Sequence, residues 1–195
     1  MSKTVALLSA LCLAVSALAA PGTYRIDPRH TFPSFEADHQ GGKSIWRGKI
    51  TKTTGTITLD RAARSGTVDV TMDMSSISFG IAAMDDHIRS PDYLDVARYP
   101  LATYKGKLTG WHGDAPGMVD GELTLHGVTR PLQLSINSLL CKPDHALKVE
   151  SCGADASGSF NRDDFGIDGP KAYKFLMFVR LAIQIEAFKI PSPKP

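Results

Sequence analysis

The chain has 195 residues, of which 43% are hydrophobic and 22% are charged. That hydrophobic content excludes a disordered chain, and the length suits one domain with a buried core. Lysine and arginine total 22 against 20 aspartate and glutamate, so the formal net charge is only +2. This near balance excludes the broad basic surface of a nucleic-acid-binding protein. We therefore expect no nucleic-acid partner and a function that depends on a shaped site.

The N-terminus has the composition of a secretory signal peptide. Lys3 precedes an apolar run over residues 5–18, which is shorter than the roughly 20 residues that a membrane-spanning helix needs. Ala17-Leu18-Ala19 then supplies the small-x-small pattern that signal peptidase recognises. We expect cleavage after Ala19, so residues 1–19 are the predicted signal peptide and the predicted location is the periplasm.

Two cysteines remain after this leader, Cys141 and Cys152. Cysteines close together in an exported protein usually form a disulfide, and this pair lacks the C-x-x-C spacing of a redox motif. We expect a structural cross-link that holds a hairpin together. The alternative is a pair of free, buried thiols.

Alternation of apolar and polar residues runs through most of the chain, as in Val68-Asp69-Val70-Thr71-Met72. This period is typical of strands with one buried face, and therefore of antiparallel sheets. Glycines mark the reversals between strands. We expect about eight strands, two of them split or bent by a bulge, near residues 24–28, 32–39, 45–59, 66–78, 101–110, 118–126, 131–140, and 147–162 with 177–188.

Residues 82–95 break the alternation. Ser90 suits a helix N-cap and Pro91 the first helical position, so we expect one or two short helices before Pro100. Prolines after Lys189 predict a flexible tail over residues 190–195, which leaves one domain over residues 20–189. About eight antiparallel strands can close into a barrel or pack as a sandwich, and periodicity alone does not choose between the two.

Several short motifs follow one another in the chain. They are Tyr24-x-Ile26-Asp27-Pro28-x-His30, Asp86-His87-x-Arg89-Ser90-x-Asp92-Tyr93-x-Asp95, Tyr99-Pro100, Gly121-x-Leu123-Thr124-Leu125-His126-Gly127-Val128-Thr129-x-Pro131, Cys152-Gly153-Ala154-Asp155-Ala156 and Asn161-Arg162-x-Asp164-Phe165-Gly166. In order and spacing over residues 23–188 they resemble the YceI-like family, exported lipocalin-like proteins that bind polyisoprenoid lipids. The resemblance implies an all-β fold, an extended eight-stranded antiparallel lipocalin-like barrel with a short helical insertion and a long apolar pocket.

Three positions depart from the usual family pattern. Thr31 stands where serine is usual, and Tyr93-Leu94 where a phenylalanine pair is common. Phe175-Leu176-Met177-Phe178, before the last strand, is more apolar than usual. The third departure bears on the shape of the pocket and the identity of its ligand.

A long lipid chain binds through apolar contact, since each buried CH₂ group contributes about 0.8 kcal/mol. The wall of such a pocket should come from the inward side of the alternating strands, with aromatic rings adding surface. The alternative is that these side chains, Leu132 among them, fill a solid core. The predicted ligand contacts are Phe35, Ile57, Leu59, Val68, Val70, Met72, Tyr104, Leu123, Leu125, Leu134, Ile136, Phe160, Phe165, Val179, Leu181 and Ile183.

Polar groups at the mouth of the pocket would hold the head of the lipid. For the two arginines, ion pairs with nearby carboxylates are the first hypothesis and a head-group contact is the second. Two of the histidines could instead satisfy buried backbone groups. The predicted head-group contacts are His30, His87, Arg89, His126 and Arg162.

The sequence offers little to an enzyme. Its six histidines form no H-x-H or H-E-x-x-H spacing, and G-x-S-x-G and glycine-rich phosphate motifs are absent. We therefore expect no metal, no cofactor and no catalytic residue. The alternative is an exported hydrolase or metal-assisted enzyme with histidine and aspartate at the barrel mouth, for which Asp85-Asp86-His87 is the nearest candidate.

The leading hypothesis is an exported, non-enzymatic binding protein for a long-chain isoprenoid, such as a polyprenyl lipid or quinone tail, that serves transport, storage or stress protection. A further hypothesis is an accessory module that delivers its lipid to a membrane quinone or lipid-handling protein through a surface around residues 84–100. We expect a monomer or a homodimer.

Overall fold

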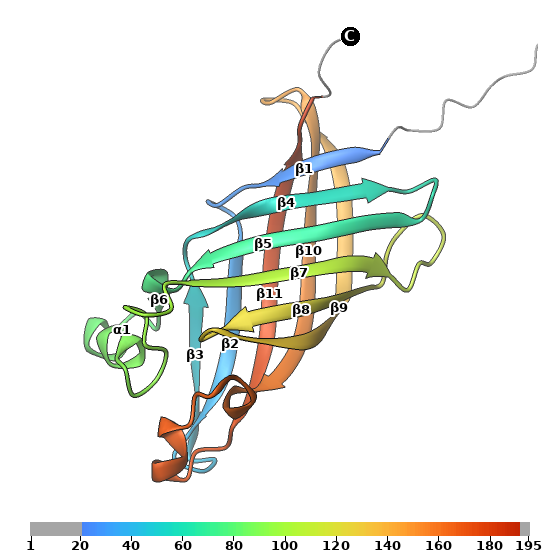
Figure 1. Ribbon diagram of the computed structural model, residues 1–195. Coiled ribbons are helices and arrows are strands. Elements are labelled where there is room, and N and C mark those ends of the chain that lie inside the picture. The colour runs from blue at the N-terminus through green and yellow to red at the C-terminus, as the bar shows by residue number, and fades with distance from the viewer. Residues whose placement is uncertain (1–20, 192–195) are drawn as a thin grey trace, which may run out of the picture.

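The computed structural model describes residues 21–191, which form one antiparallel sheet curved into a barrel (Figure 1). The predicted signal peptide and residues 192–195 of the predicted tail lie outside this range. The strands are β1 (Gly22–Ile26), β2 (Phe32–His39), β3 (Ser44–Ile50), β4 (Thr53–Asp60), β5 (Ser65–Asp73), β6 (Ile77–Ser78), β7 (Leu101–Thr109), β8 (Met118–Leu125), β9 (Val128–Asp144), β10 (Val149–Asn161) and β11 (Phe178–Lys189).

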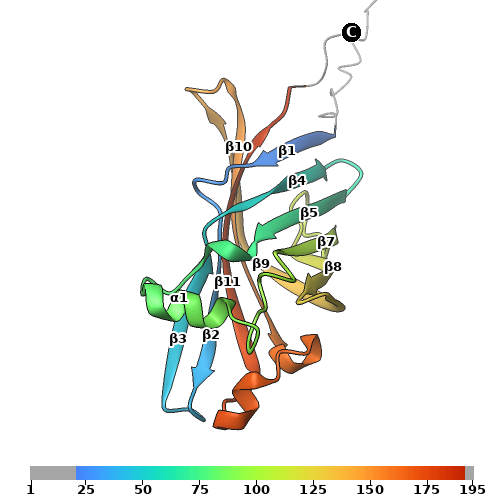
Figure 2. The same ribbon diagram turned by 60° about the vertical axis from the view of Figure 1, so that its left-hand side comes forward.

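Eight of these strands close a ring in the order β1-β4-β5-β7-β8-β9-β10-β11, because β11 also pairs with β1. The predicted eight-stranded antiparallel barrel is therefore confirmed, and the sandwich is excluded. The other strands, β2, β3 and β6, continue the sheet from β11 beyond the ring. One side of the barrel is consequently drawn out into a long wall (Figure 1 and Figure 2).

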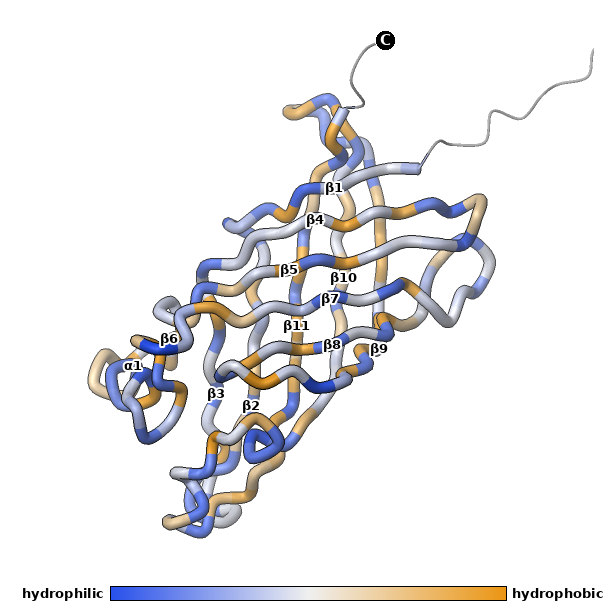
Figure 3. Tube along the Cα trace, viewed as in Figure 1, coloured by the Kyte–Doolittle hydropathy of each residue, from blue (hydrophilic) through white to orange (hydrophobic). Residues whose placement is uncertain are grey.

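Burial follows the alternation of the sequence. Leu132 and Leu134 of β9 are each 6% exposed, whereas Gln133 between them faces solvent. Figure 3 shows the same exchange of hydrophobic and hydrophilic residues along the barrel strands. β8 and β9 are joined by His126 and Gly127, whose positive φ angles of 51° and 74° are those of a tight two-residue hairpin turn.

Two of the predicted long strands are each divided by a bend. The segment expected over 45–59 forms β3 and β4, and the segment expected over 66–78 forms β5, a 3₁₀ turn and β6. The bends lie side by side, because the N–H groups of Thr51 and Lys52 donate to the Ser76 hydroxyl at 3.2 and 2.9 Å. These bends redirect the chain from the ring into the long wall.

The helical insertion is shorter than expected. A single helix, α1 (Ala82–Arg89), lies between β6 and β7. Ser90 ends this helix and does not begin a second one, since Pro91 favours the extended backbone that Ser90 adopts. Two 3₁₀ helices, η2 (Arg162–Phe165) and η3 (Gly169–Tyr173), connect β10 to β11. In the described part of the chain, no helix is long and apolar enough to cross a membrane.

Cys141 and Cys152 stand directly opposite each other in β9 and β10 and are joined by a disulfide. The predicted cross-link and the hairpin that it holds are therefore confirmed. At the end of β11, the Ile190 N–H donates to the Thr23 carbonyl at 2.7 Å, so the first residue of the predicted tail is still held by β1.

β11 changes partner along one edge. Residues 179–184 pair with β2, and residues 187–189 pair with β1. At the corner between the two partners, the Thr31 hydroxyl donates to the Glu186 carbonyl at 3.2 Å and accepts from the Glu186 N–H at 3.1 Å. Thr31 is only 1% exposed, so its hydroxyl takes the place of a backbone partner where water has no access.

We expect Thr31→Val to lower the free energy of unfolding by about 1–3 kcal/mol, because the buried Glu186 N–H then lacks an acceptor. Thr31→Ser keeps the hydroxyl and should be the more stable of the two variants. Urea denaturation of both proteins measures the difference. Equal stability of the valine and serine variants would show that the hydroxyl does not hold this corner.

Candidate functional site: an apolar cavity in the barrel

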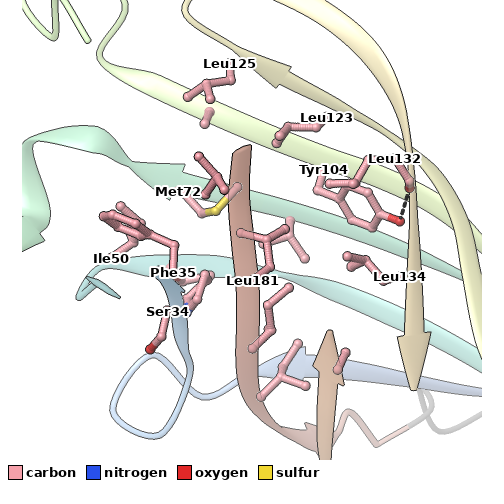
Figure 4. A pocket seen from close by; sticks show the side chains of 18 of the residues that line it. Ser34, Phe35, Ile50, Met72, Tyr104, Leu123, Leu125, Leu132, Leu134 and Leu181 are labelled. Atoms are coloured by element: carbon pink, nitrogen blue, oxygen red, sulfur yellow. Dashed lines mark hydrogen bonds between the residues drawn. The ribbon is translucent and has the colours of Figure 1, made fainter. Parts of the chain in front are cut away.

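The barrel encloses a cavity of about 340 Å³, within the size range of small-molecule sites. Its wall takes side chains from every strand of the ring and from α1. Figure 4 shows leucine, isoleucine, methionine and aromatic side chains directed into this space from opposite sides. An apolar enclosure of this kind favours an apolar ligand.

The structure places fifteen of the sixteen predicted contact residues on the cavity wall, and Leu132 joins them. Whether a ligand touches them stays a prediction. The fifteen are Phe35, Ile57, Leu59, Val68, Val70, Met72, Tyr104, Leu123, Leu125, Leu134, Ile136, Phe160, Val179, Leu181 and Ile183.

Phe165 is the exception, because it does not line the cavity. It belongs to η2, where alternation does not govern the direction of a side chain, and it is 1% exposed. Its ring packs edge-on against Phe160 with the centroids 5.1 Å apart. Phe165 therefore serves the core next to the cavity.

The side chains of the cavity wall differ in how completely they are covered. Leu123 and Leu134 on β8 and β9 are each 6% exposed, whereas Leu181 and Ile183 on β11 are half-buried although they also line the cavity. Half-buried wall residues also lie on β4, β5 and β9, so the uncovered apolar surface is spread over several strands.

One polar group inside the cavity is fully engaged by the protein. The Tyr104 hydroxyl lies 2.9 Å from the Leu132 carbonyl and 3.2 Å from the Val119 carbonyl, both acceptors (Figure 4). Burial raises the pKa of Tyr104 well above its ordinary value. The phenol stays neutral and contributes a ring to the wall.

Of the predicted head-group contacts, His87 and Arg162 line the cavity, and His30, Arg89 and His126 do not. The His30 ring lies 2.7 Å from the Asp27 carboxylate at the corner between β1 and β2. His126 bonds the Phe165 carbonyl through Nδ1 at 3.1 Å. Both histidines serve local structure.

Arg89 is likewise occupied elsewhere. Its guanidinium donates to the carbonyls of Asp85 and Ser75, each at 2.8 Å, and contacts the Asp86 carboxylate at 3.1 Å. These bonds fasten α1 to the turn before β6. Arg89 therefore has a structural role, as first expected, but its carboxylate partner is Asp86.

Arg162 is 8% exposed and is the cation nearest the apolar space. Its Nη2 donates to the carbonyls of Leu176 and Asp38 at 2.6 and 3.2 Å. Among the described residues, its Nε is buried without an acceptor and no carboxylate lies within ion-pair distance. Burial lowers the pKa of Arg162, although Asp38 opposes the shift. This guanidinium retains donors that the protein does not use.

The alternation did not identify the part of the wall that lies outside the regular ring. Trp46 on β3, Phe79 after β6, and Met84 and Ile88 on α1 all line the cavity. The segments of Phe79 and of α1 do not follow a period of two. Trp46 does stand on the inner face of the alternating strand β3, but the exposed Ile45 beside it breaks the apolar pattern in the sequence. The concentration of aromatic residues is the signal that could have indicated them.

The cavity opens at the end next to α1 and η3. Tyr24 and Leu59, at the opposite end, line it and are only 2% and 6% exposed. His87 lines it and is exposed, and Trp46 and Phe175 line it and are half-buried. Solvent therefore reaches the wall from the α1 side, where the unused donors of Arg162 also lie.

A polar cluster closes the opposite end. The Tyr24 hydroxyl donates to the Glu150 carboxylate, and Arg61 Nη1 lies 3.5 Å from the same oxygen. Burial opposes ionisation of Glu150, but the Tyr24 hydroxyl and the Arg61 charge outweigh it and hold the pKa of Glu150 below its usual range. Glu150 also lies near both cysteines, but sulfurs joined in a disulfide are poor metal ligands.

The contribution of Glu150 to stability should depend on pH. Because its pKa is lowered in the folded protein, its stabilisation is complete above the ordinary value of 4.5 and is lost as the pH falls through the lower folded-state value. The stability difference between the wild type and Glu150→Gln should therefore shrink on acidification, as thermal unfolding at pH 7 and at pH 3 will measure. A difference that is the same at both pH values would contradict this role.

Known proteins resemble this chain along most of its length. The family model described as the YceI-like domain matches residues 24–187. A UPF0312 protein of Pseudomonas savastanoi pv. phaseolicola is 32% identical over 169 residues, 85% of this chain and 86% of that protein. Protein YceI of Escherichia coli O157:H7 is 34% identical over 155 residues, 78% of each chain.

Solved structures share the fold. The YceI protein of Campylobacter jejuni matches with a TM-score of 0.66 at 22% identity, over 76% of this chain and 87% of that chain. A polyisoprenoid binding domain from Saccharophagus degradans matches with a TM-score of 0.59 at 16% identity, over 86% of this chain and 98% of that chain. The barrel, the cavity and the sequence matches agree: the chain belongs to the YceI-like family.

Proposed function

We propose that the protein is an exported binding protein that holds a long-chain isoprenoid or a related lipid inside its barrel. The observation that carries the proposal is the cavity of about 340 Å³, whose wall is almost entirely apolar. The structural neighbour from Saccharophagus degradans, described as a polyisoprenoid binding domain, supports this class of ligand. The signal-peptide pattern in residues 1–19 supports a periplasmic location.

The apolar wall suits a hydrocarbon chain. Each CH₂ group transferred from water into the cavity contributes about 0.8 kcal/mol, so a chain of several isoprene units needs few polar contacts. Half-buried side chains on β11, such as Leu181 and Ile183, would be covered by the chain. Their burial on binding is the main source of the expected affinity.

The polar end of the lipid is proposed to lie at the mouth, beside His87 and Arg162. Nη1 and Nε of Arg162 donate no hydrogen bond to the described residues. The oxygen of a phosphate, carboxylate or quinone carbonyl can accept from a guanidinium. The closed end near Tyr24 offers no comparable unused donor, so the chain would enter tail first.

The geometry gives no support to the hydrolase hypothesis. The Asp85 carboxylate accepts from the Phe79 N–H at 2.6 Å and from the Ser78 hydroxyl at 3.1 Å, and Asp86 pairs with Arg89. Neither carboxylate is hydrogen-bonded to the His87 ring in the described structure. We propose a role in binding without a chemical step.

Extraction of the natively purified protein with organic solvent, followed by mass spectrometry, tests the function directly. We expect one prenyl or other long-chain lipid per protein molecule. A folded protein that contains no lipid, and takes up none from prenyl alcohols added in detergent, would overturn the proposal.

A bulky side chain inside the cavity should displace the lipid. In Ile183→Trp the new side chain would point into the cavity, whereas Ala182→Trp would place the same side chain on the outer surface of the same strand. We expect the first variant to lose most of its bound lipid and the second to retain it, as mass spectrometry of extracts will show. Retention of lipid by both folded variants would place the ligand outside this cavity.

Arg162 should favour a charged head group. We expect Arg162→Met to bind geranylgeranyl phosphate at least about tenfold more weakly than the wild type, because a hydrogen bond to a charged group contributes about 1.5–3 kcal/mol. Binding of geranylgeraniol should change little. Arg89→Met, which removes an arginine that does not line the cavity, is the control. Fluorescence competition measures all the affinities, and equal weakening for both ligands would contradict a head-group role.

A further inference from the structure

Exposed apolar side chains gather at the same end of the molecule as the cavity mouth. Ile45 near the start of β3 is 48% exposed, and Tyr173, Leu176 and Phe178 around the start of β11 are 64%, 58% and 46% exposed. We refer to these four residues as the rim. The rim includes part of the apolar segment before the last strand, which departs from the usual family pattern.

The rim has two parts, Ile45 on β3 and the three residues around the start of β11, and Asp38 holds them together. Its carboxylate accepts from the Gly41 N–H at 2.9 Å, within the turn that leads to Ile45, and from the Leu176 N–H at 2.8 Å. Ile45 stands opposite Asp38 in the β2–β3 register. Arg162 adds a bond to the carbonyl of each segment. The rim is therefore one fixed surface at the end of the long wall (Figure 1 and Figure 2).

Lysines lie beside the rim, while Asp38 stands between its two parts and Asp168 at its border. Residues 40–46 and 169–178 contain Lys43, Lys171 and Lys174 and no aspartate or glutamate. Lys171 is paired with Asp163 and Asp168. The other two lysines form no ion pair among the described residues. Apolar side chains framed by lysine are the combination that binds an anionic lipid surface.

Aromatic rings connect the rim with the interior of the cavity. Neighbouring rings in the series have centroids 5.1–6.1 Å apart. The outermost ring belongs to the rim and the others line the cavity. The series runs through Tyr173, Phe175, His39, Trp46, Phe79 and Phe35. An unbroken series of rings, which includes the His39 imidazole, therefore leads from the exposed tip to the cavity wall.

We propose that the rim docks on an anionic lipid bilayer and sets the cavity mouth against the membrane, so that lipid passes between bilayer and barrel along the aromatic path. This inference rests on the proposed function and names the surface through which the cargo is exchanged. Lysine and aromatic side chains favour the interface of a membrane. The rim is a narrow end of the molecule, which suits insertion between head groups better than the broad contact of a protein interface.

The surface around residues 84–100, the earlier candidate for a membrane partner, lacks this combination. Its exposed residues include Asp86, Asp92 and Arg98, and its large apolar side chains are turned inward. Leu140 and Leu147 are 58% and 51% exposed and belong to the β9–β10 hairpin, whose tip lies at the opposite end of the molecule (Figure 1). They provide a matched control.

Flotation of the purified full-length protein with vesicles tests the proposal, with phosphatidylcholine alone or mixed equally with phosphatidylglycerol. We expect the wild type to float with the mixed vesicles, and Tyr173→Asp/Leu176→Asp to bind them at least about tenfold more weakly. Lys43→Gln/Lys174→Gln should also bind about thirtyfold more weakly, since each of the two lysines contributes about 1 kcal/mol at an anionic surface. Leu140→Asp/Leu147→Asp should bind as the wild type does. Any contribution of residues 1–20 is common to all four proteins.

A second measurement separates this proposal from the binding function. The rim variant, loaded with a fluorescent prenyl lipid in detergent, should retain the lipid but deliver it to anionic vesicles at least about tenfold more slowly than the wild type. The docking surface would be overturned if the rim variant bound vesicles as the wild type does and transferred lipid at the wild-type rate. It would also be overturned if the wild type bound no vesicles, or if the control variant lost as much vesicle binding as the rim variant. Failure of every variant and the wild type to hold lipid would instead overturn the proposed function.

Discussion

The architecture depends on β11 keeping hydrogen bonds along both edges while its neighbour changes from β2 to β1. A sheet that simply continued past this point would leave an unpaired N–H in the interior, which costs about as much as a lost hydrogen bond. The buried Thr31 hydroxyl fills that position by accepting from the Glu186 N–H. The ring and the long wall can therefore share one strand.

The same alternation of residues builds both a packed core and an open cavity. On the β8–β9 side the inward leucines are packed tightly, and Tyr104 fixes its hydroxyl on backbone carbonyls. On the β11 side the inward residues Leu181 and Ile183 retain exposed surface inside the barrel. The wall thus combines closely packed side chains with incompletely covered ones, which a flexible apolar molecule can cover.

Period-two patterning predicted the ring and its inner face well, because one face of a strand must be buried. It placed Leu123, Leu134 and Leu181 on the cavity wall from sequence alone. It failed for Phe165, whose direction is set by a 3₁₀ turn, and for Trp46, because the exposed Ile45 beside it breaks the apolar alternation of β3. These side chains depend on contacts between distant segments.

The polar residues were harder to predict than the apolar ones, for a physical reason. A histidine or arginine in a loop can satisfy a backbone group or face a cavity, and only the folded chain determines which. His126 and Arg89 satisfy backbone carbonyls, whereas Arg162 keeps donors free beside the mouth. The motifs indicated where these residues cluster in the sequence, but the fold decides which of them meet the apolar space.

The closed end of the barrel limits how a molecule can enter and leave the cavity. Tyr24, Glu150 and the nearby disulfide join β1, β9 and β10 where the cavity stops. A tunnel with one blind end cannot pass a molecule from one side to the other. Whatever enters must reverse along the same path, with the group that entered last leaving first. A lipid chain bound in such a cavity would therefore leave through the opening by which it entered. The depth of the closed end would limit how much of a long chain the cavity can cover.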